Sequence, residues 1–290
     1  MSTPRRAIIL ALATAIITSG EVRPQSEYSD GQTITTRFAK RLGKLVQAKA
    51  VVPMKTLVEQ AQAFTRFTVN TPAAPDAQLS PEELYASCRD SVVLVGAVYK
   101  CKKCAHWHAM SASGFALSDD GLIVTSRHVV SSNAQCEALG IMTRDGRLFP
   151  VKEVVASDPV NDLVILRTDA TGLRPLPVAA DIPVGAPVYA IHHANPNLYA
   201  FTQGAVIGKF MDSRQQRQPA RTLAISADYA PGSSGGPILD QYGAVAGIIC
   251  SVSPVEIHGN GSTNSMVNMV WKYSVPSAAL LELIKSPVTP

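Results

Sequence analysis

The stretch 227-ADYAPGSSGGPILD-240 holds two prolines, three glycines and two adjacent serines directly before the apolar residues Ile238 and Leu239. Glycine loses more conformational entropy on folding than any other residue, so a glycine cluster indicates that the main chain approaches another group closely or needs unusual backbone angles. A serine in such a turn is a candidate nucleophile. The turn DQYG (240–243) follows and leads into another apolar run, so we expect this segment to connect two β-strands.

A serine hydroxyl is a weak nucleophile until a base takes its proton, and a carboxylate usually orients that base. His128 lies near the end of the apolar run GLIVTSRHVV (121–130), and Asp162 opens the run NDLVILRT (161–168). The stretch GSSGG also matches the nucleophile elbow of α/β-hydrolases, which needs a following helix and a later acid and histidine. Here only His258 follows, in a glycine-rich loop. The order His, Asp, Ser therefore argues against the elbow.

From residue 80 onward the sequence consists mainly of short β-branched runs separated by turns such as SDDG (118–121) and DQYG. Regular short strands with almost no helix between them predict an all-β barrel or sandwich. SPEELYASC (80–88) has a serine cap, a proline at the first helical position and a glutamate at the third, which predicts a short helix. The segment PSAALLELIK (276–285) predicts a closing helix.

Composition excludes some classes of function. The 290 residues are 46% hydrophobic and 17% charged, which suffices for one main domain, and the net charge of +4 is too small to indicate a nucleic-acid partner. Basic residues concentrate in 31–70, where 34–50 has the apolar spacing of an amphipathic helix and 54–64 that of a second one. We expect residues 21–79 to form a basic helical N-terminal extension ending in a Pro/Ala linker. A solvated helix face is favoured there over contact with a membrane, with a trimer contact or a spacer role as alternatives.

The first 20 residues predict a secretory signal peptide, because two arginines precede an apolar run from Ala7 to Ile17 that ends in small residues. No later run is long enough to cross a membrane, and the mature protein is expected to be exported, to the bacterial periplasm or outside the cell. Five cysteines fit an exported protein with one or two disulfides and a free thiol.

The segment 101-CKKCAHWH-108 places four metal-binding side chains, Cys101, Cys104, His106 and His108, within eight residues. Zinc sites use C-x-x-C pairs, but they usually draw the second pair of ligands from a distant segment. A disulfide in a hairpin is therefore favoured, with free thiols and a metal site as alternatives. Cys250 lies in a predicted strand near the site and is expected to be a buried thiol.

Four blocks, SGFALSDDGLIVTSRHVV, ASDPVNDLVILR, GSSGGPILDQYGAVAGI and YSVPSAALLELI, resemble in order and spacing those of trypsin-like serine peptidases, and most closely the HtrA/Deg branch. The resemblance covers about residues 82–286 and implies two antiparallel β-barrels, with the protease domain spanning 80–290. It implies Ser234 as nucleophile, His128 as general base, Asp162 as its partner, and the N–H groups of Gly232 and Ser234 as oxyanion hole. It further implies polypeptide substrates, no cofactor, no metal in the site, and a homo-oligomer such as a trimer.

Details of the site are less constrained by the resemblance. Asp228 and Tyr229 are candidates for the specificity pocket, with a small or apolar preference favoured over a basic one. Ser233 stands where the HtrA branch usually has asparagine, and no PDZ domain is expected after 286. His192 and His193 fit structural histidines, although one of them is also a candidate for substrate contact. The competing functions are a noncatalytic peptide-binding module with the same cleft and a metal-dependent redox or scaffold protein built on Cys101 and Cys104.

Overall fold

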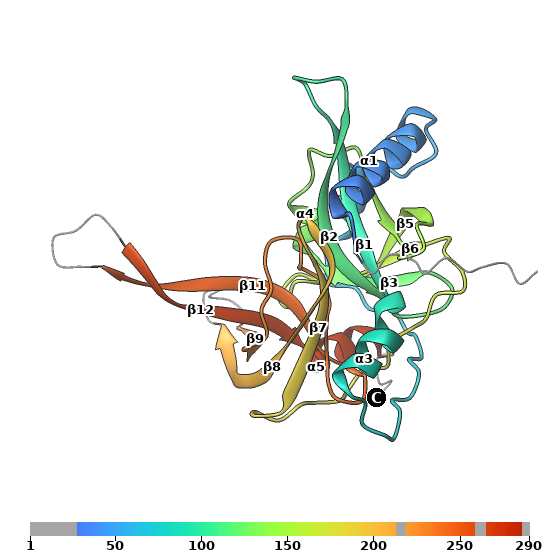
Figure 1. Cartoon of the computed structure of the whole chain (residues 1–290). Helices are drawn as coiled ribbons and strands as arrows, with labels where there is room; N and C mark the ends of the chain where they lie inside the picture. Colours follow the sequence, from blue (N-terminus) through green and yellow to red (C-terminus); the bar gives the residue numbers. More distant parts are fainter. Residues whose placement is uncertain (1–27, 213–218, 259–264, 286–290) are drawn as a thin grey trace, which may run out of the picture.

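The computed structural model describes residues 28–212, 219–258 and 265–285, so the predicted signal peptide lies outside the described residues. Twelve strands form two closed antiparallel barrels of six strands each (Figure 1). This confirms the all-β fold with two barrels.

The first barrel has the strand order β1-β2-β3-β6-β5-β4. Its strands are β1 Val92–Lys100, β2 Trp107–Ala116, β3 Leu122–Ser126, β4 Ala138–Met142, β5 Leu148–Asp158 and β6 Leu163–Thr168. The second barrel has the order β10-β11-β12-β9-β8-β7. Its strands are β7 Pro187–Ala194, β8 Asn197–Asp212, β9 Ala220–Ile225, β10 Pro237–Leu239, β11 Val245–His258 and β12 Ser265–Pro276. Strand β10 has only three residues and lies in the segment that the sequence analysis expected to connect two strands.

Strand β1 explains why the first barrel needs a covering helix. Its residues from Val92 to Val98 are all buried, so both faces of this strand are apolar. Val93 and Val95 point into the barrel core, whereas Leu94 and Val98 pack in a separate cluster outside it. A strand buried on both faces reads as a continuous apolar run, and a second layer must cover its outer face.

Helix α1 (Gly31–Gln47) provides that layer. Asp30 caps it by accepting a hydrogen bond from the Thr33 N–H at 3.0 Å. Phe38 and Leu42 are completely buried in the cluster with Leu94 and Val98, while the basic residues of the helix face solvent. The helix is amphipathic as predicted, and its apolar face packs against the first barrel.

The remaining helices are short. They are α2 Met54–Gln60, α3 Pro81–Cys88, the 3-10 turn η1 Arg89–Ser91, α4 His128–Ser131 and α5 Ser277–Ile284. The capping box of α3 is formed as predicted, since Ser80 Oγ accepts from Glu83 N–H and the Glu83 carboxylate accepts from Ser80 N–H. Helix α5 packs on the core shared by the two barrels and confirms the predicted closing helix.

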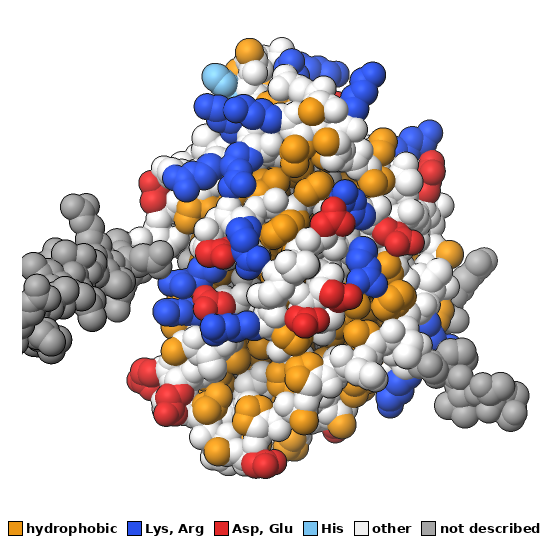
Figure 2. All heavy atoms as spheres, turned by 90° about the vertical axis from the view of Figure 1, so that its right-hand side faces the viewer, with side chains coloured by type: hydrophobic (Ala, Val, Ile, Leu, Met, Phe, Trp, Pro, Cys, Tyr) orange, Lys and Arg blue, Asp and Glu red, His pale blue; other side chains and the backbone are white. Residues whose placement is uncertain are grey.

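The surface mixes charges of both signs. Figure 2 shows Lys and Arg side chains gathered on the upper part of one face, with Asp and Glu side chains interspersed below them. Among the described residues, no helix combines the length and the apolar character needed to span a bilayer.

All five cysteines are free thiols in the structure, so the expected disulfides are not formed. Cys88 and Cys136 are buried in two different hydrophobic clusters, and Cys250 lies beside Asp162. Cys101 and Cys104 stand at the turn between β1 and β2. The fold thus separates the cysteines into four regions and brings only Cys101 and Cys104 near each other.

Phe38→Ala tests the attachment of α1 to the barrel. Removing a fully buried aromatic side chain should cost about 3–5 kcal/mol of the free energy of unfolding. The measurement is urea-induced unfolding followed by circular dichroism. Lys40→Ala on the exposed face of the same helix is the control and should change stability by less than about 0.5 kcal/mol. Equal stability of the two variants would contradict this account of α1.

Candidate active site

His128 and Asp162 each lie next to a turn that follows a strand of the first barrel. His128 is the first residue of α4, which begins directly after β3. Asp158 closes a turn after β5 by accepting hydrogen bonds from the N–H groups of Val160 and Asn161 at 2.9 and 3.1 Å. Asp162 then takes a left-handed backbone conformation with φ of 56°, which is uncommon outside glycine and is found at functional sites.

Asp162 contacts His128 through both of its carboxylate oxygens. Its Oδ1 accepts from the His128 backbone N–H at 2.8 Å, and its Oδ2 lies 2.5 Å from His128 Nδ1. A carboxylate oxygen can only accept here, so Nδ1 carries the proton and Nε2 of the neutral ring is left with its lone pair. The sequence prediction that Asp162 sets the tautomer of His128 is thus consistent with the contact.

Opposing effects act on the pKa of His128. Burial of the ring lowers it, while the hydrogen bond and the negative charge of Asp162 raise it, and the net pKa lies above its ordinary value. The side chains of His128 and Asp162 are 39% and 26% exposed, so solvent still reaches the pair. The ring is therefore a proton acceptor that is strengthened by its carboxylate partner.

Ser234 lies in the turn that precedes β10 in the second barrel. Its Oγ donates a hydrogen bond to the Cys250 carbonyl at 3.4 Å, and no hydrogen bond to His128 is present among the described residues. The next residue, Gly235, packs so tightly against Thr125 that a Cβ there would collide with its Oγ1. Thr125 is three residues before His128, so the nucleophile turn and the histidine belong to one site. Catalytic hydrogen bonds are often long in a ligand-free site and tighten on substrate binding.

Cys250 is a part of this site whose contacts the sequence did not reveal. Its carbonyl accepts from Ser234, and its thiol lies 3.4 Å from Asp162 Oδ2. Burial and the neighbouring Asp162 carboxylate raise the pKa of Cys250 to about 12, so the thiol stays protonated and donates to Asp162. The atoms of His128, Asp162 and Cys250 that could bind a metal ion lie within 4.8 Å of one another. These groups already form hydrogen bonds with each other.

Gly232 shapes the turn around Ser234. Its φ is 98°, and a Cβ at this position would lie 2.5 Å from the His193 carbonyl oxygen. Within the described part of the chain, the backbone N–H groups of Gly232 and Ser234 donate to no protein acceptor. An oxyanion needs N–H donors that are not used by protein acceptors, so these two groups remain candidates for that role.

The first barrel holds this turn through Ser113 on β2. The N–H of Ser113 donates to the Ser234 carbonyl at 2.9 Å, and its Oγ donates to the Gly232 carbonyl at 3.0 Å. The same Oγ accepts from the His193 N–H at 2.9 Å. Ser113 is completely buried, so these contacts are shielded from water.

Buried histidines hold the other side of the turn. His192 and His193 are each 1% exposed, and burial lowers their pKa values to about 4 and about 3. His192 Nε2 lies 3.2 Å from the Asp228 carbonyl and must donate, so Nδ1 accepts from the Ser233 hydroxyl at 2.8 Å. His193 Nδ1 accepts from the Tyr199 N–H. Both are buried, neutral groups, which fits the structural role that the sequence analysis favoured.

Comparison with known proteins agrees with this geometry. A family model described as a trypsin-like peptidase domain matches residues 112–248. Protease Do-like 1, chloroplastic, from Arabidopsis thaliana is 36% identical over 146 residues, covering 48% of this chain and 32% of that protein. A probable periplasmic serine endoprotease DegP-like from Hahella chejuensis is 33% identical over 142 residues, covering 48% of this chain and 29% of that protein.

Residues 112–248 of this chain thus match a trypsin-like peptidase domain, and the chain is similar to Do-like and DegP-like proteases. A third relative, Protease Do-like 5, chloroplastic, from Arabidopsis thaliana, is 31% identical over 153 residues, covering 48% of this chain and 47% of that protein. The chain thus matches less than half the length of these curated relatives.

The candidate specificity residues of this trypsin-like domain differ in accessibility. The Asp228 side chain is 81% exposed, and its carboxylate pairs with Lys272 Nζ at 2.6 Å. Tyr229 is buried, with its hydroxyl 3.0 Å from the Ser251 carbonyl and 2.8 Å from the Tyr273 carbonyl. The Asp228 charge is therefore already compensated, and Tyr229 is a wall of the second barrel's core.

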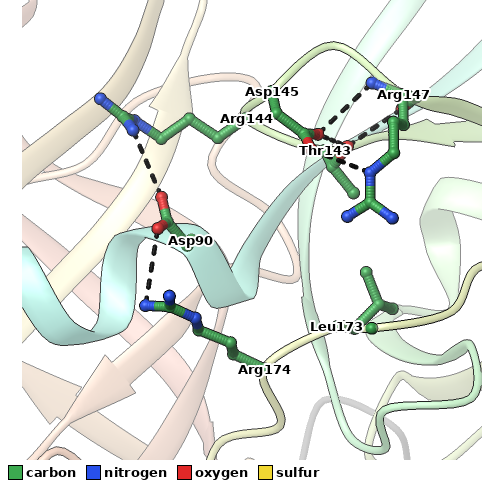
Figure 3. A pocket seen from close by; sticks show the side chains of 8 residues that line it. Asp90, Thr143, Arg144, Asp145, Arg147, Leu173 and Arg174 are labelled. Carbon is green, nitrogen blue, oxygen red and sulfur yellow. Dashed lines mark hydrogen bonds and ion pairs between the residues drawn. The ribbon is translucent and has the colours of Figure 1, made fainter. Parts of the chain in front are cut away.

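Two hollows bear on the location of the site. A hollow of about 90 Å³ adjoins the catalytic candidates and is lined by Asp162, Cys250, Ser251 and Tyr273 among others. A larger one of about 270 Å³ lies elsewhere (Figure 3), where Asp90 pairs with Arg144 and Arg174. Three arginines and two aspartates line it, and it contains none of the catalytic candidates.

Asp162→Asn tests the source of the His128 pKa. The wild-type pKa should lie above its ordinary value of about 6.5, because the carboxylate stabilises the imidazolium more than burial destabilises it. In the variant the negative charge is lost while burial remains, so the pKa should fall below that value. The measurement is an NMR titration of the ring protons. Asp228→Asn removes a carboxylate paired with Lys272 instead and should leave the pKa of His128 unchanged.

Proposed function

We propose that this protein is an exported serine endopeptidase that hydrolyses peptide bonds in exposed or unfolded polypeptide segments. The observation that carries the proposal is the bond between Asp162 Oδ2 and His128 Nδ1, which leaves Nε2 free to act as a base. The names of the relatives, which include serine endoproteases described as DegP-like, support the reaction class. Export rests on residues 1–20 and on the word periplasmic in those names.

In the proposed reaction, His128 Nε2 takes the proton of the Ser234 hydroxyl as its oxygen attacks the substrate carbonyl carbon. The carbonyl oxygen becomes an oxyanion and accepts hydrogen bonds from the N–H groups of Gly232 and Ser234. The tetrahedral intermediate collapses to an ester on Ser234 as His128 passes the proton to the departing amine. Water then attacks the ester, with His128 as base again, and releases the acid and free Ser234.

This mechanism requires Ser234 to change its hydrogen-bond partner. Its hydroxyl must turn from the Cys250 carbonyl, which it contacts at a long 3.4 Å, toward His128. Rotation about one side-chain torsion between staggered rotamers is inexpensive. The same starting contact is the observation that favours the second candidate function, a noncatalytic module that holds peptides in the cleft.

We further propose a preference for small or apolar residues at the cleavage site. The Asp228 carboxylate is already neutralised by Lys272, so it offers no free charge to a lysine or arginine side chain. Tyr229 is buried with its hydroxyl satisfied, so it presents no polar group either. Assembly into a homo-oligomer such as a trimer, implied by the family resemblance, stays a prediction.

A fluorophosphonate probe tests the proposed nucleophile. The probe should label the wild-type protein at Ser234, as located by mass spectrometry of the modified peptide, and Ser234→Ala should abolish labelling. Ser111→Ala on β2 removes a half-buried serine outside the site and should be labelled like wild type. Folded wild-type protein that resists the probe would favour the noncatalytic module. Labelling that persists in Ser234→Ala would place the nucleophile elsewhere.

Gly232→Ala tests the oxyanion donors. The new Cβ would strain the backbone and press on the His193 carbonyl, turning the N–H away from the oxyanion. Loss of one such donor should lower kcat for a peptide substrate about 100- to 1000-fold.

Gly185→Ala is the matched control for this change, because Gly185 has a similar φ of 89° but no atom near the added Cβ. It should lose some stability and keep its kcat. If the two variants lose equal activity, the effect comes from general backbone strain and Gly232 has no special role.

A further inference from the structure

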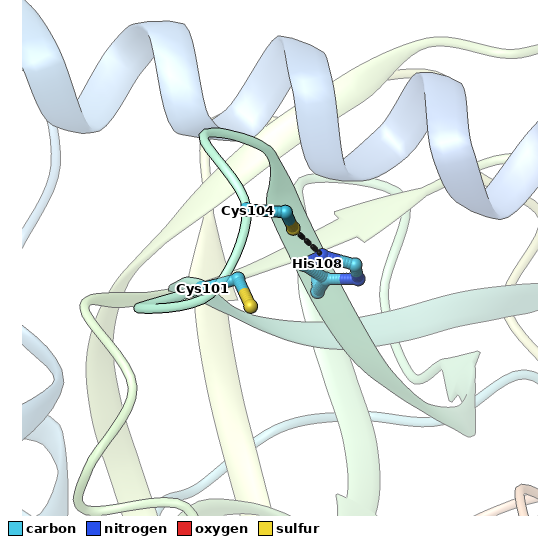
Figure 4. Close-up of side chains that lie close together, drawn as sticks. All are labelled: Cys101, Cys104 and His108. Carbon is cyan, nitrogen blue, oxygen red and sulfur yellow. Dashed lines mark hydrogen bonds between the residues drawn. The ribbon is translucent and has the colours of Figure 1, made fainter.

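The tip of the β1–β2 hairpin brings together three metal-binding side chains that the proposed proteolysis does not use. Cys101, Cys104 and His108 place their ligand atoms within 4.8 Å of one another (Figure 4). Cys104 Sγ lies 3.1 Å from His108 Nε2. They are the ligand types that zinc favours in proteins, two thiols and one imidazole.

The spacing of these atoms matches the size of a zinc coordination shell. Zinc holds sulfur at about 2.3 Å and imidazole nitrogen at about 2.0–2.1 Å, so tetrahedral neighbours lie roughly 3.5–3.8 Å apart. The distance of 3.1 Å between Cys104 Sγ and His108 Nε2 is just below this range, and the upper limit of 4.8 Å for the three ligand atoms is just above it. Small side-chain rotations therefore suffice to place all three ligands around one ion.

The backbone of the tip holds the ligands in position. His108 pairs with Tyr99 near the end of the β1–β2 ladder, and their rings stack with centroids 5.6 Å apart. The Lys103 N–H donates to Cys101 Sγ at 3.4 Å, and the Cys101 N–H donates to the His106 carbonyl at 3.2 Å. An N–H directed at sulfur stabilises a thiolate, the form of cysteine that binds metals.

The tip is also braced from outside. Trp107, which precedes His108, packs so closely on α1 that a Cβ on Gly43 would collide with its indole. Trp107 belongs to the edge of the cluster that contains Phe38 and Leu42. The imidazole ligand is therefore attached to a fixed strand, and only the short C-x-x-C turn has to adjust.

The local charge selects the class of ion. The segment 100–108 contains three lysines and no acidic residue, so it offers no carboxylate to a hard cation such as calcium or magnesium. Two thiolates would neutralise the charge of a divalent ion. His108 is exposed and both cysteines are half-buried, so water can reach a fourth position.

We propose that Cys101, Cys104 and His108 form a zinc site of two thiolates and one imidazole at the tip of the β1–β2 hairpin, with water as fourth ligand. Binding would join the turn to strand β2 and hold the tip closed. The site lies outside the catalytic candidates and stands independently of the proposed proteolysis.

The test is metal binding to the full chain, reduced and freed of metal, then titrated with Zn²⁺ and separately with Co²⁺. We expect one Zn²⁺ per chain by elemental analysis. The Co²⁺ form should show a near-ultraviolet sulfur-to-cobalt charge-transfer band, which reports thiolate ligation directly and needs no variant.

The Cys101→Ser, Cys104→Ser and His108→Ala variants should each weaken Zn²⁺ binding by more than about 100-fold, since even outer-shell partners of metal ligands contribute 10–100-fold. Cys136→Ser, a buried cysteine of the barrel core, and His106→Ala are matched controls and should bind like wild type. Circular dichroism establishes that each variant is folded.

Three results would overturn the proposal. The first is reduced wild-type protein that binds no Zn²⁺ and shows no charge-transfer band with Co²⁺. The second is unchanged binding in His108→Ala. The third is a Cys101–Cys104 disulfide that persists when the protein is equilibrated with Zn²⁺ in a glutathione buffer, which would return this segment to the disulfide that its sequence favoured.

Discussion

The contact between Ser113 and the nucleophile turn is the constraint on which this site depends. The catalytic candidates come from different barrels, His128 and Asp162 from the first and Ser234 from the second. Ser113 on β2 binds the carbonyls of both Ser234 and Gly232, so one buried residue of the first barrel fixes the turn of the second. A buried hydrogen bond is costly to leave unmade, which makes this docking specific in its geometry.

Ser113 binds the carbonyls of Ser234 and Gly232, and the N–H groups of these two residues have no protein acceptor in the described part of the chain. His192 also stabilises the turn, because one tautomer of its ring binds both the Ser233 hydroxyl and the Asp228 carbonyl. Its low pKa keeps that tautomer neutral across the physiological range. The turn is thus organised before substrate arrives, which is what electrostatic stabilisation of an oxyanion requires.

Cys250 connects the halves of the site. Its thiol donates to Asp162 while its carbonyl accepts from Ser234, so it contacts a catalytic candidate from each barrel. Since burial and the nearby carboxylate keep the thiol protonated, its role at Asp162 is that of a hydrogen-bond donor rather than of a second nucleophile. A donor at Asp162 Oδ2 helps to hold the carboxylate in the position from which it binds His128.

The sequence by itself determined the class of fold and the identity of the catalytic candidates. Strand spacing after residue 80, the capping box at Ser80 and the order of His128, Asp162 and Ser234 are local or ordered patterns, and such patterns survive in one dimension. Strand β10 was missed because three residues carry too little periodicity to be recognised. The predicted disulfides were wrong because cysteine spacing does not specify which thiols meet in space.

Tertiary structure alone decided how these groups are used. Several decisive contacts join residues that are far apart in the chain. They are the packing of Phe38 and Leu42 against β1, the hydrogen bonds of Ser113 to the turn that holds Ser234, and the contact of Cys250 with Asp162. The pairing of Asp228 with Lys272 likewise depends on the position of β12, which carries Lys272, relative to the turn that carries Asp228. Contacts of this kind follow from how barrels close and dock, and local sequence patterns carry no record of that packing.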